Sequence, residues 1–452
     1  MERKRIYLCL AHMSEAELEL KYIKEAFDTN WVVPLGPNVN GFEKDLEEFL
    51  RPVGSKRPEV ERVNEQEKSL SKRVVALSAG TAAVHLALIA CGVGPGDEVC
   101  VQSFTFCASS HPITYLGATP VFIDSEMDTW NMDPELLEKA IIDRKEKTGK
   151  YPKAIVPVAL YGMPYKIDQI MAIANKYGIP VVEDAAEGFG SKFNGQVLGT
   201  FGKYGVLSFN GNKMITTSGG GALITENEDE WREIMMYATQ YRESYPYYQH
   251  EKIGYNYRMS NICAGIGRGQ MTVVNDHIAH HKHVQKLYEK LLKDVKGVTV
   301  HCQPSDVIST NVERSLDCAR DDVPVYDSNY WLCTITLDPD LKIKGQENAY
   351  KTIVTGAVGG AAGVIHAASS AVTDCQPNEN VEALRVFMDQ AQIEARPVWK
   401  PMHKQPVYKN APAYVNGVSE EIFKVGMCLP AGPYVSDEDV KYIVDTIKSA
   451  IE

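Results

Sequence analysis

One lysine lies in a setting that could make its amine a nucleophile. Lys213 comes five residues after Ser208, which ends the apolar segment 205–208, and it precedes Ser218 and three glycines. Most lysines are solvated surface groups, so the residue type alone indicates nothing. A lysine drawn into a pocket loses its water, however, which lowers its pKa and makes the amine usable in covalent chemistry. The sequence therefore marks Lys213 as a candidate nucleophile.

A carboxylate ends a second apolar segment. Asp184 follows Val181-Val182-Glu183 and precedes Ala185-Ala186-Glu187. An aspartate there is either a helix cap or a functional carboxylate, and the sequence favours neither. A pyridine-type cofactor needs such a carboxylate, because it keeps the ring nitrogen protonated and lets the ring take up electrons from a substrate carbanion.

Two weaker signals follow other apolar segments. Ser78-Ala79-Gly80-Thr81 leads into a helical pattern, and small residues there would let a phosphate approach the N–H groups at a helix N-terminus. An ordinary helix cap with close packing is the commoner explanation. Ser103-Phe104-Thr105-Phe106 carries aromatic side chains that are usually core, although one could stack on a planar ring.

The elements that must position these residues alternate in type along the chain. Seven apolar segments are expected to be strands: 74–77, 98–101, 120–123, 154–158, 180–183, 205–208 and 222–224. Helical patterns lie between them at 81–91, 134–143 and 166–177. Several strands lack polar–apolar alternation, which indicates helices on both faces. The repetition predicts a mainly parallel α/β sheet that binds ligands beyond the carboxyl ends of its strands.

A long helical pattern over residues 260–293 would link this large domain to a smaller one. We place the large domain at 1–280 and the small domain at 281–452, a length that suits two domains. The small domain is expected to mix a strand with helices, at 331–337, 380–390 and 437–451.

Composition excludes several classes of protein. The net charge of −12 argues against general binding to nucleic acid or anionic membranes. The start of the chain lacks the apolar core of a secretion signal, and the uncharged run 352–373 is too rich in Gly, Ala, Ser and Thr for a membrane span. The ten cysteines show neither a Cys-x-x-Cys pair nor zinc spacing. A cytoplasmic protein with reduced thiols is expected.

The chain resembles the DegT–DnrJ–StrS family of nucleotide-sugar aminotransferases. The resemblance covers most of the sequence, since segments 31–36, 254–261 and 396–403 recur in the right order around those described above. It implies the aspartate-aminotransferase fold (fold type I), with a large domain built on a mainly parallel seven-stranded sheet and a smaller α+β domain. It also implies pyridoxal 5′-phosphate (PLP) as cofactor and a homodimer with shared active sites.

The resemblance assigns a role to the residues that would touch the cofactor ring. Lys213 would hold PLP as a Schiff base and carry protons. Asp184 would face the pyridine nitrogen, and Glu187 would lie near the phenolic oxygen. Phe106 would stack on the ring.

Phosphate and substrate contacts follow in the same way. Three residues of one subunit would contact the phosphate: Gly80, Thr81 and Ser208. Asn256 would reach the phosphate from the neighbouring subunit. Arg258 and His403 resemble groups on the substrate side.

The lysine also bears on the type of reaction. Family members that replace it with histidine are sugar dehydratases, so Lys213 favours amino transfer. The segment 210–213 with Ser218 is most similar to aminotransferases of the bacillosamine type, which act at carbon 4 of a UDP-linked 4-keto-6-deoxy-N-acetylhexosamine for surface glycan synthesis. Glutamate is the implied amino donor. The alternatives are a PLP-dependent lyase or dehydratase and a non-catalytic PLP-binding regulatory protein.

Three segments depart from the family pattern. Residues 51–72 and 304–322 are expected to be surface insertions, and 355–371 is unusually rich in Ala and Gly.

His277 and His281 share a helix face, but no third ligand is near them in sequence, so a solvated linker helix is favoured over a metal site.

Overall fold

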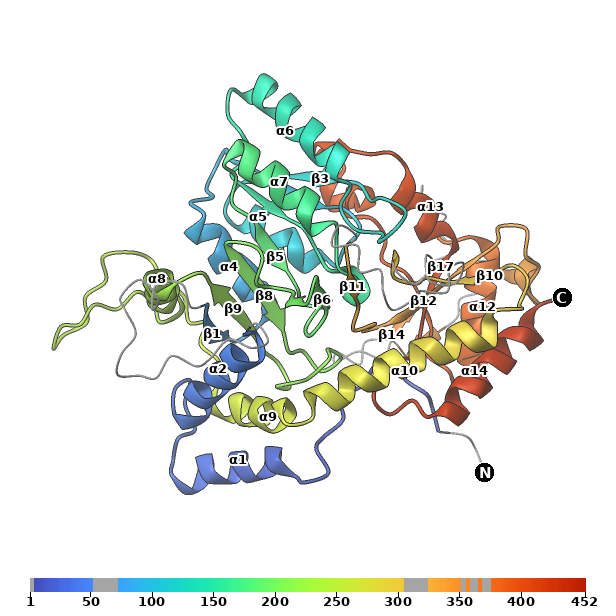
Figure 1. Cartoon of the computed structure of the whole chain (residues 1–452), viewed down its shortest axis with the longest axis horizontal. Coiled ribbons are helices and arrows are strands. Elements are labelled where there is room, and N and C mark those ends of the chain that lie inside the picture. Colours follow the sequence, from blue (N-terminus) through green and yellow to red (C-terminus); the bar gives the residue numbers. More distant parts are fainter. Residues whose placement is uncertain (1–3, 52–71, 305–323, 351–354, 358–364, 368–374) are drawn as a thin grey trace, which may run out of the picture.

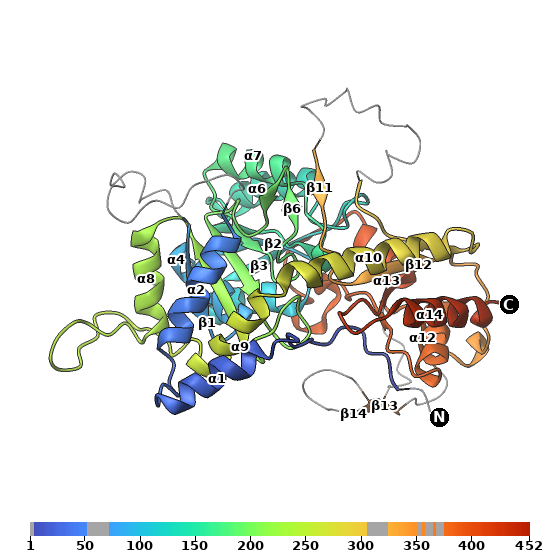
Figure 2. The same ribbon diagram turned by 60° about the horizontal axis from the view of Figure 1, so that its bottom comes forward.

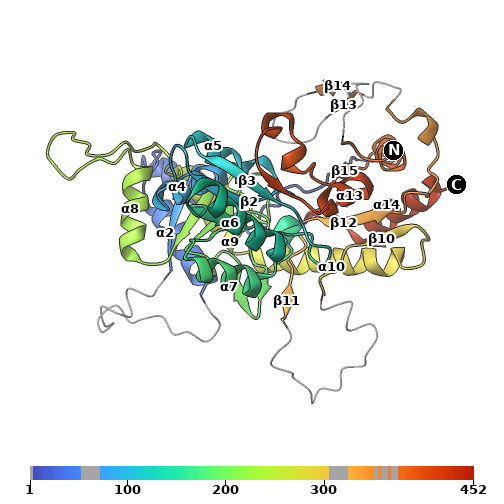
Figure 3. The same ribbon diagram turned by 90° about the horizontal axis from the view of Figure 1, so that it is seen from above.

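The computed structural model describes residues 4–51, 72–304, 324–350, 355–357, 365–367 and 375–452 (Figure 1). The predicted insertions at 51–72 and 304–322 lie almost entirely outside the described residues, as does most of the segment 355–371. Two lobes of secondary structure are visible from above, one around each main sheet (Figure 3).

The seven predicted strands are present and form the central sheet. They are β1 (Arg73–Leu77), β2 (Glu98–Gln102), β3 (Thr119–Ile123), β4 (Ala154–Val156), β5 (Val182–Asp184), β8 (Tyr204–Ser208) and β9 (Gly221–Thr225). Their order is β1-β9-β8-β5 followed by β4-β2-β3, and parallel bridges from Ile155 to Val181 and from Val158 to Asp184 join the two halves. Only β9 is antiparallel to its neighbours in this series. A short strand from the C-terminal half, β16 (Ala413–Tyr414), adds to the free edge of β3 and was not predicted.

Helices follow the strands of the central sheet and cover it. Helix α6 (Pro134–Thr148) begins after Asp133, whose side chain accepts hydrogen bonds from two backbone N–H groups, and it ends at Gly149 with φ of 79°. Helix α4 (Gly80–Ala90) is buried continuously from Ala82 to Leu88. Helix α7 (Ile167–Tyr177) follows β4 as predicted. The strands are thus buried on both faces, as their lack of alternation indicated.

The second sheet is antiparallel and belongs to the smaller lobe. It consists of β10 (Val298–Val300), β12 (Cys333–Leu337), β17 (Gly426–Leu429) and β15 (Arg396–Pro397), in that order. Helices α12 (Glu379–Gln390) and α14 (Asp437–Ala450) contribute to the apolar cluster around this sheet. The expected strand and both expected helices of this region are therefore present.

The long helical pattern is two helices rather than one. Helix α9 (Asn261–Met271) ends at Thr272, and α10 (Val274–Leu292) begins after Val273, whose φ of −115° is not helical. Helix α10 runs between the lobes (Figure 1), since Ile278 packs in the core of the large lobe and Tyr288 in that of the small lobe. The predicted domain division at residue 281 falls inside α10 and stays a prediction.

The N-terminal segment also joins the lobes (Figure 2). Ile6 forms a parallel bridge with Ile393 and is buried in the small core. Five residues later, Ala11 N–H donates to the carbonyl of Gly211 at 3.1 Å, in the loop that carries Lys213. Helices α1 (Leu18–Asp28) and α2 (Pro37–Phe49) then pack on α9.

The remaining described elements are short or peripheral. They are α5 (His111–Tyr115), α8 (Glu228–Ala238), α13 (Val418–Val425), β6 (Lys192–Phe193), β7 (Gln196–Val197), β11 (Tyr326–Asp327), β13 (Thr355–Ala357), β14 (Ile365–Ala367) and 3-10 turns at Cys107–Ser109, Leu160–Gly162, Gln346–Asn348, Met402–Lys404 and Pro406–Tyr408. Across the described part of the chain, no helix combines the length and apolar character needed to cross a bilayer.

Candidate active site

A cavity of about 290 Å³ lies at the carboxyl ends of β1, β5 and β8. Seven of the predicted site residues line it: Gly80, Thr81, Phe106, Asp184, Glu187, Ser208 and Lys213. Loops that follow parallel strands meet at one edge of a sheet, so residues distant in sequence converge there. The structure thus brings the predicted cofactor contacts of one subunit together.

Lys213 lies inside this cavity between an anion and an aromatic ring. Its Nζ atom is 3.3 Å from Oε1 of Glu187 and 4.0 Å from the centroid of the Trp331 ring. The lysine side chain is only 13% exposed. Backbone hydrogen bonds of Phe209 to Gly220 and of Thr217 to Phe209 hold its loop closed at the base. The amine is therefore drawn out of bulk water, as its setting in the sequence indicated.

Asp184 ends β5 at the floor of the cavity. Oδ2 accepts a hydrogen bond from Ser109 Oγ at 2.7 Å, and Oδ1 accepts one from the backbone N–H of Ala186 at 3.1 Å. No helix begins after Asp184, so the helix-cap alternative does not apply. Burial raises the pKa of this carboxyl, while the two hydrogen bonds and the charge of Lys213 act to lower it.

Glu187 is buried beside Lys213. Its Oε2 atom accepts the backbone N–H of Tyr161 at 2.7 Å, which requires Tyr161 to adopt the left-handed φ of 54°. Such a conformation is uncommon for a residue other than glycine, and it turns the N–H toward the carboxylate. Burial raises the pKa of Glu187, and the charge of Lys213 opposes this effect.

The opposite end of the cavity is a cradle for an anion. Helix α4 begins there, and its cap residue Ala79 has no side chain that could bond the first N–H groups. A Cβ atom on Gly80 would lie 3.0 Å from Cβ of Ser208, and one on Gly221 would lie 2.4 Å from the Gly80 nitrogen. Glycines thus bring the helix end and the Ser208 hydroxyl close together.

These residues fit the shape and chemistry of PLP. The helix N-terminus with Thr81 and Ser208 suits its phosphate, and the buried Asp184 suits its ring nitrogen. Phe106 is 49% exposed at the cavity, with its ring centroid 5.3 Å from that of Trp399. Its ring is available to cover a planar cofactor.

Three predicted site residues do not line this cavity. Asn256 is exposed and pairs with Thr239. The buried guanidinium of Arg258 forms an ion pair with Glu43 and donates to the carbonyl of Ala76. The roles of Asn256 and Arg258 toward a partner's cofactor or a substrate stay predictions.

His403 is the third of these residues. Its Nδ1 atom lies 2.7 Å from Ser103 Oγ, and its Nε2 atom lies 3.2 Å from Oε1 of Glu420. Both ring nitrogens therefore have protein partners, and the side chain connects the turn after β2 to α13. Its substrate role also stays a prediction.

Sequence reasoning missed four residues of the site: Ser109, Tyr161, Trp331 and Trp399. Each reaches the cavity or its acidic groups through a contact that joins distant parts of the chain. An aromatic residue at the start of a predicted strand was the only signal for Trp331, and it indicates a core position equally well.

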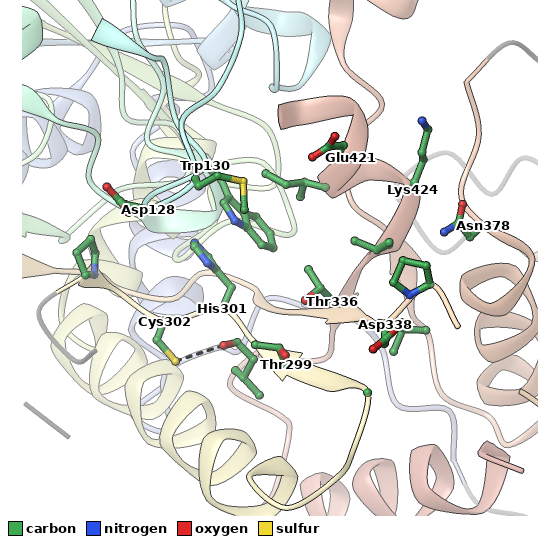
Figure 4. Close-up of a pocket in the computed structure, with 18 residues that line it drawn as sticks. Asp128, Trp130, Thr299, His301, Cys302, Thr336, Asp338, Asn378, Glu421 and Lys424 are labelled. Atoms are coloured by element: carbon green, nitrogen blue, oxygen red, sulfur yellow. Dashed lines mark hydrogen bonds between the residues drawn. The ribbon is translucent and has the colours of Figure 1, made fainter. Parts of the chain in front are cut away.

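A larger cavity of about 1170 Å³ lies between the large lobe and β10, β12 and α13 (Figure 4). Trp130 and His301 stack there with ring centroids 3.8 Å apart. None of the predicted site residues lines this cavity.

His277 and His281 of α10 are buried, so the prediction of a solvated helix face at these residues is wrong. Nδ1 of His277 lies 3.2 Å from the carbonyl oxygen of Met214, and Nδ1 of His281 lies at the same distance from that of Tyr330. Within the described residues no cluster of metal-binding side chains is found.

Comparison with known proteins identifies relatives over nearly the full length. The model of the DegT/DnrJ/EryC1/StrS aminotransferase family matches residues 54–317 and 348–448. EpsN of Bacillus subtilis (strain 168), named as a pyridoxal phosphate-dependent aminotransferase, is 38% identical across 98% of this chain and 95% of its own. The GDP-perosamine synthase of Escherichia coli O157:H7 is 30% identical across 95% of this chain and 94% of its own.

Solved structures agree with the fold. A DegT DnrJ EryC1 StrS aminotransferase from Brucella abortus superimposes with a TM-score of 0.73 at 26% identity, covering 96% of this chain and 95% of that one. The PLP form of the sugar aminotransferase Spr1654 from Streptococcus pneumoniae has a TM-score of 0.72 at 21% identity, with coverage of 98% and 97%.

Proposed function

Since this chain belongs to the DegT/DnrJ/EryC1/StrS aminotransferase family and is thus a PLP-dependent nucleotide-sugar aminotransferase, we propose a specific reaction for it. The enzyme moves an amino group from glutamate to carbon 4 of a UDP-linked 4-keto-6-deoxy-N-acetylhexosamine. The observation that carries the reaction type is one cavity that holds a desolvated amine, Lys213, together with a buried carboxylate, Asp184. The segment Asn210-Gly211-Asn212-Lys213 supports the choice of sugar.

The residues that line the cavity then have separate roles. Gly80, Thr81 and Ser208 would hold the phosphate of PLP, Phe106 would cover its ring, and Asp184 would keep its pyridine nitrogen protonated. When bound, PLP supplies an electron sink for the carbon that loses a proton. Nζ of Lys213 would be the group that takes up this proton and gives it back, because it is the amine that lines the cavity. Glu187 keeps the amine oriented between these steps.

The sugar assignment is tested by supplying glutamate with a panel of UDP-, TDP- and GDP-linked keto-sugars and detecting the amine by mass. The UDP-4-keto-6-deoxy-N-acetylhexosamine is expected to react with the highest kcat/KM. Faster amination of a 3-keto sugar, or of a GDP- or TDP-linked sugar, would contradict the assignment while leaving the reaction type intact.

We also propose a homodimer in which Asn256 of one subunit completes the phosphate site of the other. The exposure of Asn256 supports this role, because it lies outside its own subunit's cavity. Mixing inactive Lys213→Ala and Asn256→Ala proteins should restore activity, since a mixed dimer contains one intact site. Absence of restoration after verified subunit exchange would contradict shared sites.

A cytoplasmic location completes the proposal. Within the described residues no disulfide joins the cysteines, and several of them, such as Cys100 and Cys428, are buried. Reduced thiols are typical of proteins kept in a reducing compartment.

A further inference from the structure

The amine of Lys213 rests on a tryptophan that comes from the other lobe. Its Nζ atom lies 4.0 Å from the ring centroid of Trp331, which is 2% exposed and lies two residues before the small-lobe strand β12 begins at Cys333. Glu187 contacts the same amine through Oε1 at 3.3 Å. One face of the lysine is thus polar and the other aromatic.

Trp331 is held firmly in this position. Its Nε1–H donates to the carbonyl of Asn212 at 2.7 Å, next to Lys213 in the chain, and its backbone N–H donates to Oδ1 of Asn329 at 2.8 Å. Tyr161 lies nearly parallel to the indole, with an interplanar angle of 16° and centroids 6.5 Å apart. The ring has little freedom to turn away from the amine.

A single buried amide ties the two neighbours of the lysine together. Nδ2 of Asn329 donates to the carbonyls of Glu187 and Phe189, both at 2.9 Å, while Oδ1 accepts from Trp331. A Cβ atom on Gly162 would lie 1.9 Å from that Oδ1 atom, so the site has room for glycine only. Asn329 therefore joins the backbone of Glu187 to the backbone of Trp331.

We propose that Trp331 is a positioning residue for Lys213. The indole face of Trp331 holds the lysine amine in the cavity whenever that amine carries no bond to the cofactor. The negative face of an indole attracts the ammonium form of Lys213, and the ring excludes water from that side. Glu187, 3.3 Å away, accepts the proton that the ammonium must lose before the neutral amine can form a bond. A lysine side chain has many rotamers, so a fixed resting place raises the fraction of time that the amine is ready to react. The inference rests on the role proposed above for Lys213.

The experiment measures capture of PLP by Lys213 in apoenzyme. Borohydride quenching at successive times, followed by peptide mapping, gives the rate of bond formation for wild type, Trp331→Leu and Trp331→Phe. Affinity for pyridoxamine 5′-phosphate, which forms no bond with lysine, is measured in parallel by fluorescence. The matched control is Trp231→Leu, because Trp231 also has a cation over its ring (Arg73, 4.6 Å) and an N–H bond to a carbonyl (Val74, 3.0 Å), but lies outside the cavity.

The rate at which Lys213 bonds to PLP is expected to be lower than in wild type by ~10-fold or more in Trp331→Leu. The rate in Trp331→Phe should be intermediate, and that in Trp231→Leu should equal the wild-type rate. Affinity for pyridoxamine phosphate should stay within about threefold of wild type in every variant. If Trp331→Leu does not fold, the rate of Trp331→Phe decides the matter.

Two results would overturn the inference: equal capture rates in wild type and the folded Trp331 variants, or a parallel loss of capture and of pyridoxamine phosphate affinity, which indicates a merely structural role. Wild-type enzyme that takes no label at Lys213 would instead contradict the proposed function itself.

Discussion

Ser109 donates a hydrogen bond of 2.7 Å from its hydroxyl to Oδ2 of Asp184, at the floor of the cavity. Burial raises the pKa of this carboxyl, and the Ser109 hydroxyl is the foremost of the groups that lower it again. The carboxylate must be ionised to keep a pyridine nitrogen protonated, so this hydroxyl helps to set the acid limit of activity.

Replacing Ser109 by alanine should move that limit. Without the hydrogen bond the pKa of Asp184 rises further, so the acid limb of kcat for the glutamate half-reaction shifts to higher pH. Activity on the alkaline side of the limb should change little. Ser110→Ala is the control, because the Ser110 hydroxyl donates to the carbonyl of Cys107 and not to a carboxylate. Identical acid limbs in the two variants would contradict this role of Ser109.

Lys213→Ala should abolish turnover while leaving a folded protein. The variant loses both the covalent anchor and the proton carrier, so kcat is expected to fall by at least ~10⁴-fold. Circular dichroism and thermal melting report the fold, and the glutamate-driven change in cofactor absorbance reports the reaction. Lys203→Ala serves as control, since Lys203 pairs with Glu230 outside the cavity. Appreciable turnover by Lys213→Ala would refute the assignment.

Gly221→Ala should damage the anion cradle. The added Cβ would lie 2.4 Å from the Gly80 nitrogen, so the start of α4 must move away from Ser208. We expect a loss of ~1–3 kcal/mol in the free energy of unfolding of the apoenzyme and weaker binding of PLP. Gly219→Ala provides the comparison for stability, because a Cβ there meets no protein atom within 4 Å. Equal melting temperatures for the two variants would show that the close approach at Gly221 does not matter.

Glu183 gives the stability of the protein a pH dependence. It is fully buried on β5, and burial raises its pKa from 4.5 to about 7. Below pH 4.5 the carboxyl is protonated in both folded and unfolded chains. As the pH rises to 7, the folded state keeps a proton that the unfolded state loses, so wild type becomes progressively less stable and the loss is complete above pH 7.

Glu183→Gln removes this titration. The amide oxygen can still accept the N–H of Phe201, which bonds the carboxylate at 3.0 Å. The free energy of unfolding of the variant relative to wild type should therefore increase by ~2–3 kcal/mol between pH 5 and pH 8. Urea unfolding of both apoenzymes at the two pH values measures the difference. Parallel pH dependence in the two proteins would show that Glu183 ionises normally.

Local patterns in the sequence were sufficient to predict the strands of the central sheet and several of the residues that line the cavity. Short apolar segments identified all seven strands, and side chains at or past their ends, such as Asp184 and Lys213, lie in one cavity because parallel strands end at one edge. The break between α9 and α10 escaped detection, because neither Thr272 nor Val273 is a strong helix breaker.

The rest of the site depends on tertiary contacts that leave no local pattern. Trp331 reaches Lys213 because the segment that leads into β12 packs in the core of the large lobe, and Tyr161 donates its N–H to Glu187 from a left-handed backbone conformation. Strand β16 has two residues, which is too short for periodicity to reveal it.

The bridge between Ile6 and Ile393 has a consequence for how the chain folds during synthesis. Ile6 and Leu8 emerge from the ribosome long before their partners at Gln392, Glu394 and Ala431 are made. Contacts between such distant positions form late, because closing a long loop is entropically costly. The small core is therefore incomplete until these partners are made, and until then the N-terminal segment around Ile6 remains unpaired and accessible to proteases and chaperones.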